Sequence, residues 1–193
     1  GEAMTTTINT VLIGYDAGPT INHTDANGSV MIGHRAGRAV TSAIGSILIG
    51  SGSGAEITTG DTNTIIGHRA FRVATTAFVT TGNHNIGIGH DAMNGGGVSG
   101  DHNIAIGSSA GDALTSGPGN VLIGKQAGGA IETGEYNIAI GAFAGDSLSD
   151  GDYNVMIGMN AGEGTTTGER MTLIGAAAVR GVATNDAIGT VAI

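Results

Sequence analysis

The strongest constraint in this chain is an Ile-Gly pair that returns at nearly constant intervals along the whole sequence. Its glycines are Gly14, Gly33, Gly50, Gly67, Gly89, Gly107, Gly124, Gly141, Gly158, Gly175 and Gly189, at intervals of 19, 17, 17, 22, 18, 17, 17, 17, 17 and 14 residues. A fixed period of this size is typical of a solenoid, because one such unit cannot bury its own apolar face. We therefore expect an all-β solenoid of about eleven coils of about 17 residues each.

Each Ile-Gly pair ends a short apolar segment that predicts a β-strand. The residue before the glycine is always Ile, and the residue two positions earlier is usually Val or Ile, so these two columns share one face of the strand and predict the inner core. The residue between them is also apolar or small, which predicts burial on both faces. We expect this middle column to pack against other copies of the chain. Its large members, the predicted interface between copies of the chain, are Leu12, Met31, Leu48, Ile65, Leu122, Met156 and Leu173.

The remaining columns of the repeat have turn chemistry. Most units carry a glycine seven residues before the Ile-Gly glycine, as at Gly134, and an Asn three residues after it, as at Asn137. Glycine adopts positive φ and Asn bonds its own nearby backbone, so we expect a repeated corner there. An Ala three residues past the Ile-Gly glycine, such as Ala144, allows close approach of a neighbouring coil or chain.

Composition and charge narrow the class of protein. The chain has 37 glycines, 3% aromatic residues and a net charge of −9, which disfavours nucleic acid and anionic membranes as partners. It has no Cys and no apolar run long enough for a membrane span. We interpret residues 1–4 as an expression remnant and residues 5–193 as one repeat domain, irregular over 5–106 and regular over 107–193. The sequence stops where another repeat is due, which predicts a fragment of a longer fibre.

The run Asn-x-x-Ile-Gly-x-x-Ala-Gly, as in residues 137–145 and 154–162, resembles the YadA-like head repeats of trimeric autotransporter adhesins and similar repeats in phage tail fibres. The resemblance covers nearly the whole chain. It implies a left-handed parallel β-roll with three chains around one axis, working in attachment outside the cell, on a bacterial surface fibre or a phage virion. The partner would be a glycan or protein receptor on a cell surface. Most units here are longer than the YadA-like unit, which favours the fibre-type variant.

A second family shares part of the motif. Ile-Gly-x-x-Ala-x also fits the hexapeptide repeat of left-handed β-helix acyltransferases, which would make the chain an enzyme. In those proteins the hexad continues around each turn, whereas stepping by sixes from Ile140 reaches Asp146 and Asp152. The required context is missing, so we favour a non-enzymatic fibre segment and keep the acyltransferase as the alternative.

Histidines and acidic residues both recur in columns and are candidate metal ligands. The acids lack the Gly-Gly-x-Gly-x-Asp pattern of calcium-binding β-rolls, so we expect them to form corners. His84 and His102 are equivalent in adjacent units and could bind a transition metal if stacked. Tyr136, Tyr153 and Arg170 occupy the same column elsewhere, which favours an exposed corner that tolerates several residue types. An imidazole pair without a third ligand is an incomplete site. We therefore expect no metal site, no cofactor and no catalytic residues.

The largest departure from the repeat is the 22-residue unit between Gly67 and Gly89. Phe71 replaces the usual Gly there, and residues 72–81 add an apolar loop that contains Phe78. Such a loop is either a binding protrusion or a flap packed on its neighbour. Where a repeat departs from its own rule, an insertion forms a loop on one face, often the binding face.

The same region carries the only basic cluster. Arg35 and Arg38 correspond column for column to Arg69 and Arg72 two units later, roughly 10 Å apart along the axis. Such a stripe could bind phosphate or carboxylate groups of a glycan, or it could lie on a solvated corner paired with acids. The candidate binding residues are therefore Arg35, Arg38, Arg69, Arg72, Phe71 and Phe78.

Overall fold

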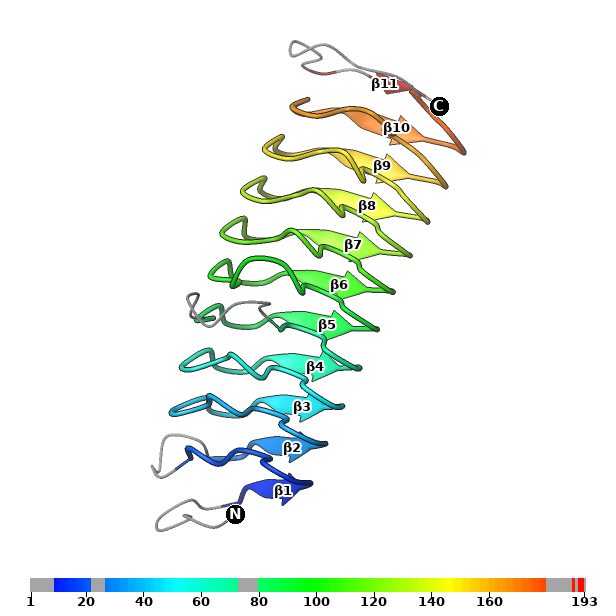
Figure 1. Cartoon of the computed structure of the whole chain (residues 1–193). Helices are drawn as coiled ribbons and strands as arrows, with labels where there is room; N and C mark the ends of the chain where they lie inside the picture. Colours follow the sequence, from blue (N-terminus) through cyan, green and yellow to red (C-terminus); the bar gives the residue numbers. More distant parts are fainter. Residues whose placement is uncertain (1–8, 22–26, 73–79, 180–188, 190, 193) are drawn as a thin grey trace.

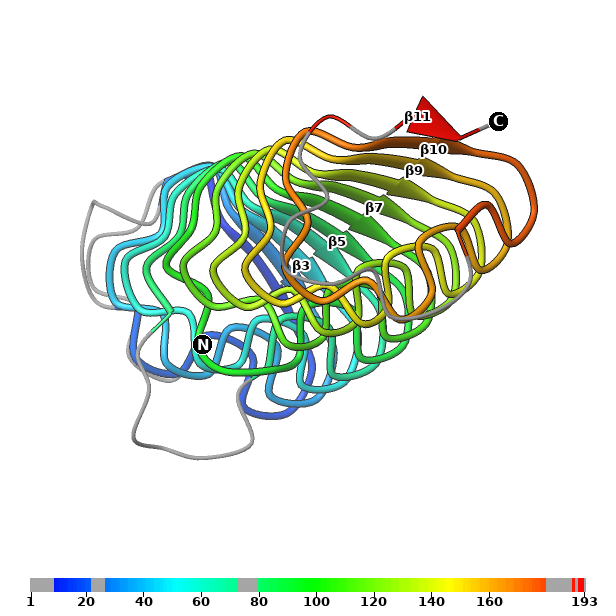
Figure 2. The ribbon, with the colours of Figure 1, turned by 90° about the horizontal axis from the view of Figure 1, so that it is seen from above.

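The protein is a parallel β-solenoid. A computed structural model describes residues 9–21, 27–72, 80–179, 189 and 191–192. Its strands stack in chain order into one parallel sheet, which forms one side of an elongated stack (Figures 1 and 2). The strands are β1 (Val11–Ile13), β2 (Val30–Ile32), β3 (Ile47–Ile49), β4 (Thr64–Ile66), β5 (Ile86–Ile88), β6 (Ile104–Ile106), β7 (Val121–Ile123), β8 (Ile138–Ile140), β9 (Val155–Ile157), β10 (Thr172–Ile174) and β11 (Val191–Ala192).

The register of the sheet follows the Ile-Gly repeat from β1 to β10. Leu12 pairs with Met31, for example, and Leu122 pairs with Ala139. The last repeat was placed wrongly. Thr172 of β10 pairs with Val191, so the final strand follows Gly189 rather than ending at it. Gly189 has φ 72°, whereas the Ile-Gly glycines from Gly14 to Gly175 have φ between 125° and 144°.

The two faces of the strands are opposite to the prediction. The middle residues point into the coil, where Met31, Leu48, Ile65, Leu122, Met156 and Leu173 are 0% exposed and Leu12 is partly buried against the same cluster. These residues therefore cannot form a trimer interface. The flanking Val and Ile residues, predicted as inner core, lie on the outer face of the sheet, and Val11 and Ile13 are 43% and 56% exposed. Period-2 alternation fixes which residues share a face, but not which face is inside.

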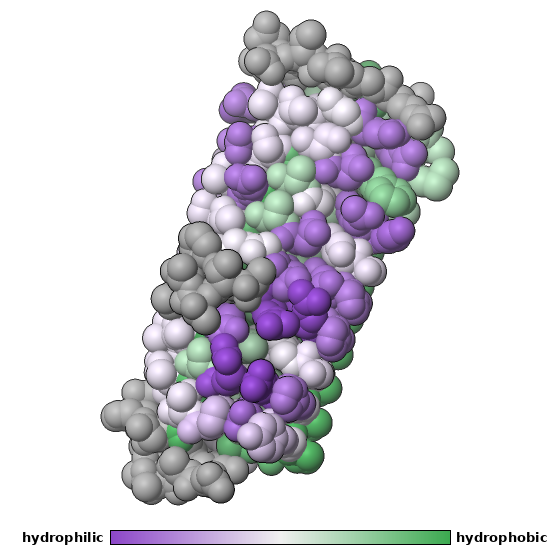
Figure 3. Space-filling model, in the orientation of Figure 1, coloured by the Kyte–Doolittle hydropathy of each residue, from purple (hydrophilic) through white to green (hydrophobic). Residues whose placement is uncertain are grey.

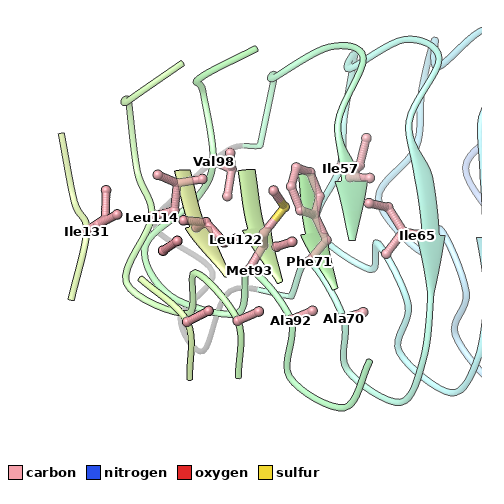
Figure 4. Packing of buried hydrophobic residues seen from close by; sticks show 14 of the residues in the cluster. Ile57, Ile65, Ala70, Phe71, Ala92, Met93, Val98, Leu114, Leu122 and Ile131 are labelled. Carbon is pink, nitrogen blue, oxygen red and sulfur yellow. The ribbon is translucent and has the colours of Figure 1, made fainter. Parts of the chain in front are cut away.

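Two further columns complete the core. The Ala column is buried, as at Ala127 and Ala144, and so is an aliphatic residue seven positions after the Ile-Gly glycine, as at Leu114 and Ile131. The prediction missed this second column. Figure 4 shows these side chains packing between neighbouring coils around the middle column of the strands. The core is narrow because each coil contributes only a few side chains.

Phe71 belongs to this core, where it is 1% exposed. Gly87 of β5 has no side chain at the middle column, and a Cβ there would contact Ile65 and the sulfur of Met93. Met93 occupies the column of Phe71 in the next coil and is also buried (Figure 4). We infer that these two large residues fill the space that Gly87 leaves. The prediction of Phe71 as a binding residue is therefore wrong.

The Asn column forms a buried ladder between coils. Asn137 accepts hydrogen bonds from the backbone N–H and the side-chain amide of Asn154, at 3.0 and 2.9 Å, and its own amide donates to the carbonyl of Gly151 at 2.7 Å. These bonds run from coil to coil, whereas the sequence predicted bonds to the nearby backbone. The ladder satisfies polar groups that would otherwise be buried without partners.

The glycine before this ladder is needed for space rather than for positive φ. A Cβ on Gly134 would lie 2.6 Å from the carbonyl oxygen of Gly151 in the next coil. Positive φ occurs two residues later instead, at Tyr136 (53°) and Tyr153 (58°). The corner was thus predicted, but its left-handed residue was assigned to the wrong column.

Candidate functional site: a basic notch

A hydrogen-bonded corner follows each of the strands β1–β10. In this strand-exit corner, the second residue after the Ile-Gly glycine has positive φ, as in Arg35 (58°), Gly52 (69°) and Arg69 (57°). The backbone N–H of Gly52 donates to the carbonyl of His34 at 2.8 Å, and that of Arg69 donates to the carbonyl of Ser51 at 2.9 Å. This ladder holds equivalent residues of successive coils above one another, so side chains along the corner form straight columns.

One coil lacks the large side chains that its neighbours carry at this corner. The coils of β2 and β4 both have His, Arg and Arg at the first, second and fifth positions after the glycine. The coil of β3 has Ser51, Gly52 and Ala55 at these positions. The result is a recess of about 170 Å³, here called the basic notch, which is lined by His34, Arg35, Arg38, Ser51, Gly52, Ala55, Glu56, His68, Arg69 and Arg72.

The notch brings together all four arginines that the sequence predicted. Figure 3 shows strongly hydrophilic residues gathered in the N-terminal half of the face turned to the viewer. The absence of side-chain volume at Gly52 was visible in the sequence as a departure from the His-Arg pattern. Its meaning depends on the strict stacking of columns, which makes one small residue between two large ones a cavity. Phe78, the remaining predicted binding residue, lies outside the described residues.

Acidic side chains partly neutralise the arginines. The guanidinium of Arg38 donates from Nη2 to both carboxylate oxygens of Glu56, at 2.9 and 3.1 Å. Nε of Arg35 lies 3.8 Å from Asp16, a weak and exposed contact. A third carboxylate, that of Asp91, lies beside Arg69.

Two of the arginines have N–H donors that make no hydrogen bond to a described residue. Nε of Arg69 lies 3.4 Å from Oδ1 of Asp91, yet it is buried and makes no hydrogen bond. Arg72 has no ion pair or hydrogen bond within the part of the chain that the structure describes. The notch therefore holds more guanidinium groups than its carboxylates occupy.

Imidazoles extend the stacked columns around the notch. The ring of His34 stacks on Tyr15 with centroids 5.8 Å apart, and the ring of His68 stacks on His90 at 5.2 Å. His90 also lies 3.1 Å from Asp91. These contacts fix the rings at the rim of the notch.

The other histidine pair lies at a different corner. His84 and His102 are stacked as predicted, with centroids 4.8 Å apart and planes inclined by 5°. Among the described residues, no group of three or more His, Asp or Glu side chains is placed to hold a metal ion. The same column continues with Tyr136 and Tyr153, which are stacked at 5.4 Å.

Toward the C-terminus the strand-exit corner becomes acidic. A second hollow of about 410 Å³ is lined there by Phe143, Asp146, Met159, Asn160 and Glu163. Asp112 occupies the same column as Asp146, and burial, followed by the charge of Asp91, raises its pKa, against a backbone hydrogen bond that lowers it. One continuous corner thus changes from basic to acidic along the stack.

The outer face of the sheet is a second candidate surface. On β1–β10 this outer sheet face consists of the first and third residue of each strand, which are Val or Ile except at Thr64 and Thr172. All of these residues are half-buried or exposed in the single chain, and none is buried. A continuous apolar surface of this length is unusual for a monomeric protein.

Comparisons with protein families, with characterised proteins and with solved structures give no match. Among the described residues there is no helix that is long and apolar enough to cross a membrane.

Proposed function

We propose that the chain is a structural and adhesive segment of a trimeric fibre, carried on a bacterial surface or a phage tail, that mediates attachment to a cell. The observation that carries this proposal is the apolar outer sheet face. In a single chain it exposes Ile13 and Ile106, at 56% and 36%, among a continuous series of Val and Ile. The resemblance to YadA-like repeats implies three chains in a left-handed roll, and the repeated coils suit a rigid spacer.

The size of this face fits a stable interface. If each of its Val and Ile side chains covers on the order of 50 Å², the face offers roughly 900 Å² per chain, compared with about 800 Å² per partner in a standard interface. We infer that the outer sheet faces of identical chains pack together. The interface in this proposal is therefore the opposite face of the strands from the one that the sequence analysis favoured.

The first prediction tests this assembly. We expect wild-type protein to sediment as a trimer of about 57 kDa, three times the chain mass of 18.9 kDa. The double substitution Ile123→Lys with Ile140→Lys places charges on the outer sheet face of adjacent coils and should give a monomer with an unchanged far-UV spectrum, because the inward-facing residues are unaltered. Sedimentation equilibrium measures both.

The matched control adds the same charges at an exposed corner of adjacent coils, as Ser116→Lys with Thr133→Lys. This variant should remain trimeric. A wild-type monomer at micromolar concentration, or a trimer of the Ile123→Lys, Ile140→Lys variant, would contradict the proposed interface. Sedimentation of the wild type as a stable dimer would agree with an interface at the outer sheet face but would contradict the threefold arrangement.

The acyltransferase alternative is tested separately by calorimetric titration with acetyl-CoA. We expect no binding. Saturable binding that is lost on substitution of His84 would favour the enzyme over the fibre.

A further inference from the structure

We propose that the basic notch is a discrete binding site for one tetrahedral oxyanion, the sulfate or phosphate ester of a sugar. Only the assignment of that sugar to a surface glycan rests on the proposed function. The ester group would enter between the coils of β2 and β4, above the small residues Ser51, Gly52 and Ala55.

The shape of the notch favours a single group rather than an extended polyanion. Its two walls are equivalent rows of His, Arg and Arg that stand two coils apart, roughly 10 Å along the stack. The coil between them lacks these side chains, so the recess is one coil high. An extended stripe would need arginine in every coil, whereas Gly52 interrupts it.

The charges of the notch favour an anion. Its four arginines are matched by three carboxylates, those of Glu56, Asp16 and Asp91, which leaves one net positive charge among these seven side chains. Arg72 has no ionic partner among the described residues, and its guanidinium lines the recess. Charge-assisted bonds to an oxyanion would give this guanidinium a partner.

The opposed walls favour a tetrahedral group. Arg35 and Arg38 line the recess from the coil on one side of Gly52, and Arg69 and Arg72 line it from the coil on the other side. A sulfate or phosphate ester presents three oxygens in different directions and can accept from both walls. The two oxygens of a carboxylate lie in one plane and suit a single guanidinium.

The test is a titration of the whole chain with inorganic sulfate at constant ionic strength, with chloride as the compensating ion and NMR amide shifts as the readout. We expect saturable shifts at Ser51 and Gly52. Arg72→Gln should weaken binding about tenfold, the loss expected for one charge-assisted hydrogen bond. Arg170→Gln is the matched control, because Arg170 lies at another corner and pairs with Glu169; it should bind like wild type.

A second variant distinguishes binding in a discrete notch from binding to a diffuse basic surface. Gly52→Arg restores the residue that both neighbouring coils carry at the same positive φ, and its Cβ would meet only side-chain atoms of Arg72 and Arg69, at 3.7 and 3.9 Å. The substitution adds a positive charge while filling the recess. A discrete notch predicts weaker sulfate binding, about tenfold or more, whereas a diffuse surface predicts tighter binding.

The source of the oxyanion is distinguished by three sugar probes: glucose 6-sulfate, glucose 6-phosphate and glucuronate. We expect one of the two esters to bind at least as tightly as inorganic sulfate and glucuronate to bind more weakly. Glucuronate binding as tight as either ester would overturn the tetrahedral assignment. Absence of saturable sulfate binding, or tighter binding by Gly52→Arg, would overturn the site itself. Sedimentation of the same samples reports separately on the fibre proposal.

Discussion

At the scale of single residues, the Ile-Gly glycines determine how closely the coils stack. Gly124 has φ 133°, a region that side chains rarely adopt, and a Cβ there would lie 2.5 Å from the carbonyl oxygen of Gly141. The obstacle is backbone, so it cannot move aside without separating two coils. Both the conformation and the contact therefore require glycine.

We predict that Gly124→Ala lowers the free energy of unfolding by more than about 3 kcal/mol or prevents folding. The control is Gly45→Ala, which also has positive φ (63°) but whose Cβ would meet only Thr62 at 3.6 Å. That control should cost about 1 kcal/mol, the strain of the left-handed region alone. Denaturant unfolding compares the two, and equal losses would show that stacking is not the limiting contact.

At the scale of elements, the Asn ladder joins the corners that precede the strands. Asn137 is buried and bonds both to Asn120 below it and to Asn154 above it. Its removal would leave the backbone N–H of Asn154 and the carbonyl of Gly151 without these partners. Buried polar groups without partners are costly.

We predict that Asn137→Ala destabilises the protein by about 2–4 kcal/mol, more than a single exposed hydrogen bond would contribute. The comparison is Thr133→Ala, in the same coil as Asn137, which removes an exposed hydrogen bond to Asp150 of the next coil and should cost less than about 1 kcal/mol. Thermal unfolding of both variants in parallel measures the difference. Similar losses of stability in the two variants would mean that water replaces the hydrogen bonds of the Asn137 side chain.

The strands also show how far the sequence could predict this fold. The repeat spacing and the apolar segment before each Ile-Gly glycine predicted β1–β10 and their register, because equivalent residues must share an environment. The parallel arrangement was implied by the resemblance to YadA-like repeats. Which face lies inside could not be read from hydrophobicity, since both faces are apolar. A usable signal was the varied size of the residues in the middle column, from Gly87 to Met156, which only neighbouring coils can compensate. The outer columns are β-branched throughout β1–β10, with Thr at positions 64 and 172 and Val or Ile elsewhere.

The candidate site was predicted in part for a similar reason. Column matching brought Arg35, Arg38, Arg69 and Arg72 together, but the recess at Gly52 was not predicted. Its existence depends on the height of one coil and on the direction of the corner side chains, which composition does not fix. Phe71 was misjudged because an insertion beside it appeared to mark a surface, whereas its ring fills space left by Gly87.

At the scale of the whole molecule, each coil contacts only its neighbours, so the protein should tolerate loss of one complete unit. Deletion of residues 142–158, one 17-residue unit, would stack β8 on β10 and place Ala139 beside Leu173. A similar step already exists between Ala105 and Leu122. We predict a folded protein with a single, slightly lower unfolding transition and an unchanged oligomeric state.

The control deletes residues 142–150, about half a unit, and should fail to fold because the following strands would lose their register. Circular dichroism and thermal unfolding distinguish the two deletions. If both variants fold equally well, the coils do not depend on column matching.

The basic notch has a fixed height on the rod, because it is formed by a single coil between two others. Gain or loss of complete units on either side would move it in steps of about 4.8 Å relative to the ends of the chain and would leave its lining residues unchanged. The distance between a bound ester and the base of a fibre would therefore be a multiple of the coil spacing. Repeat number would set the reach of such a fibre independently of its ligand chemistry.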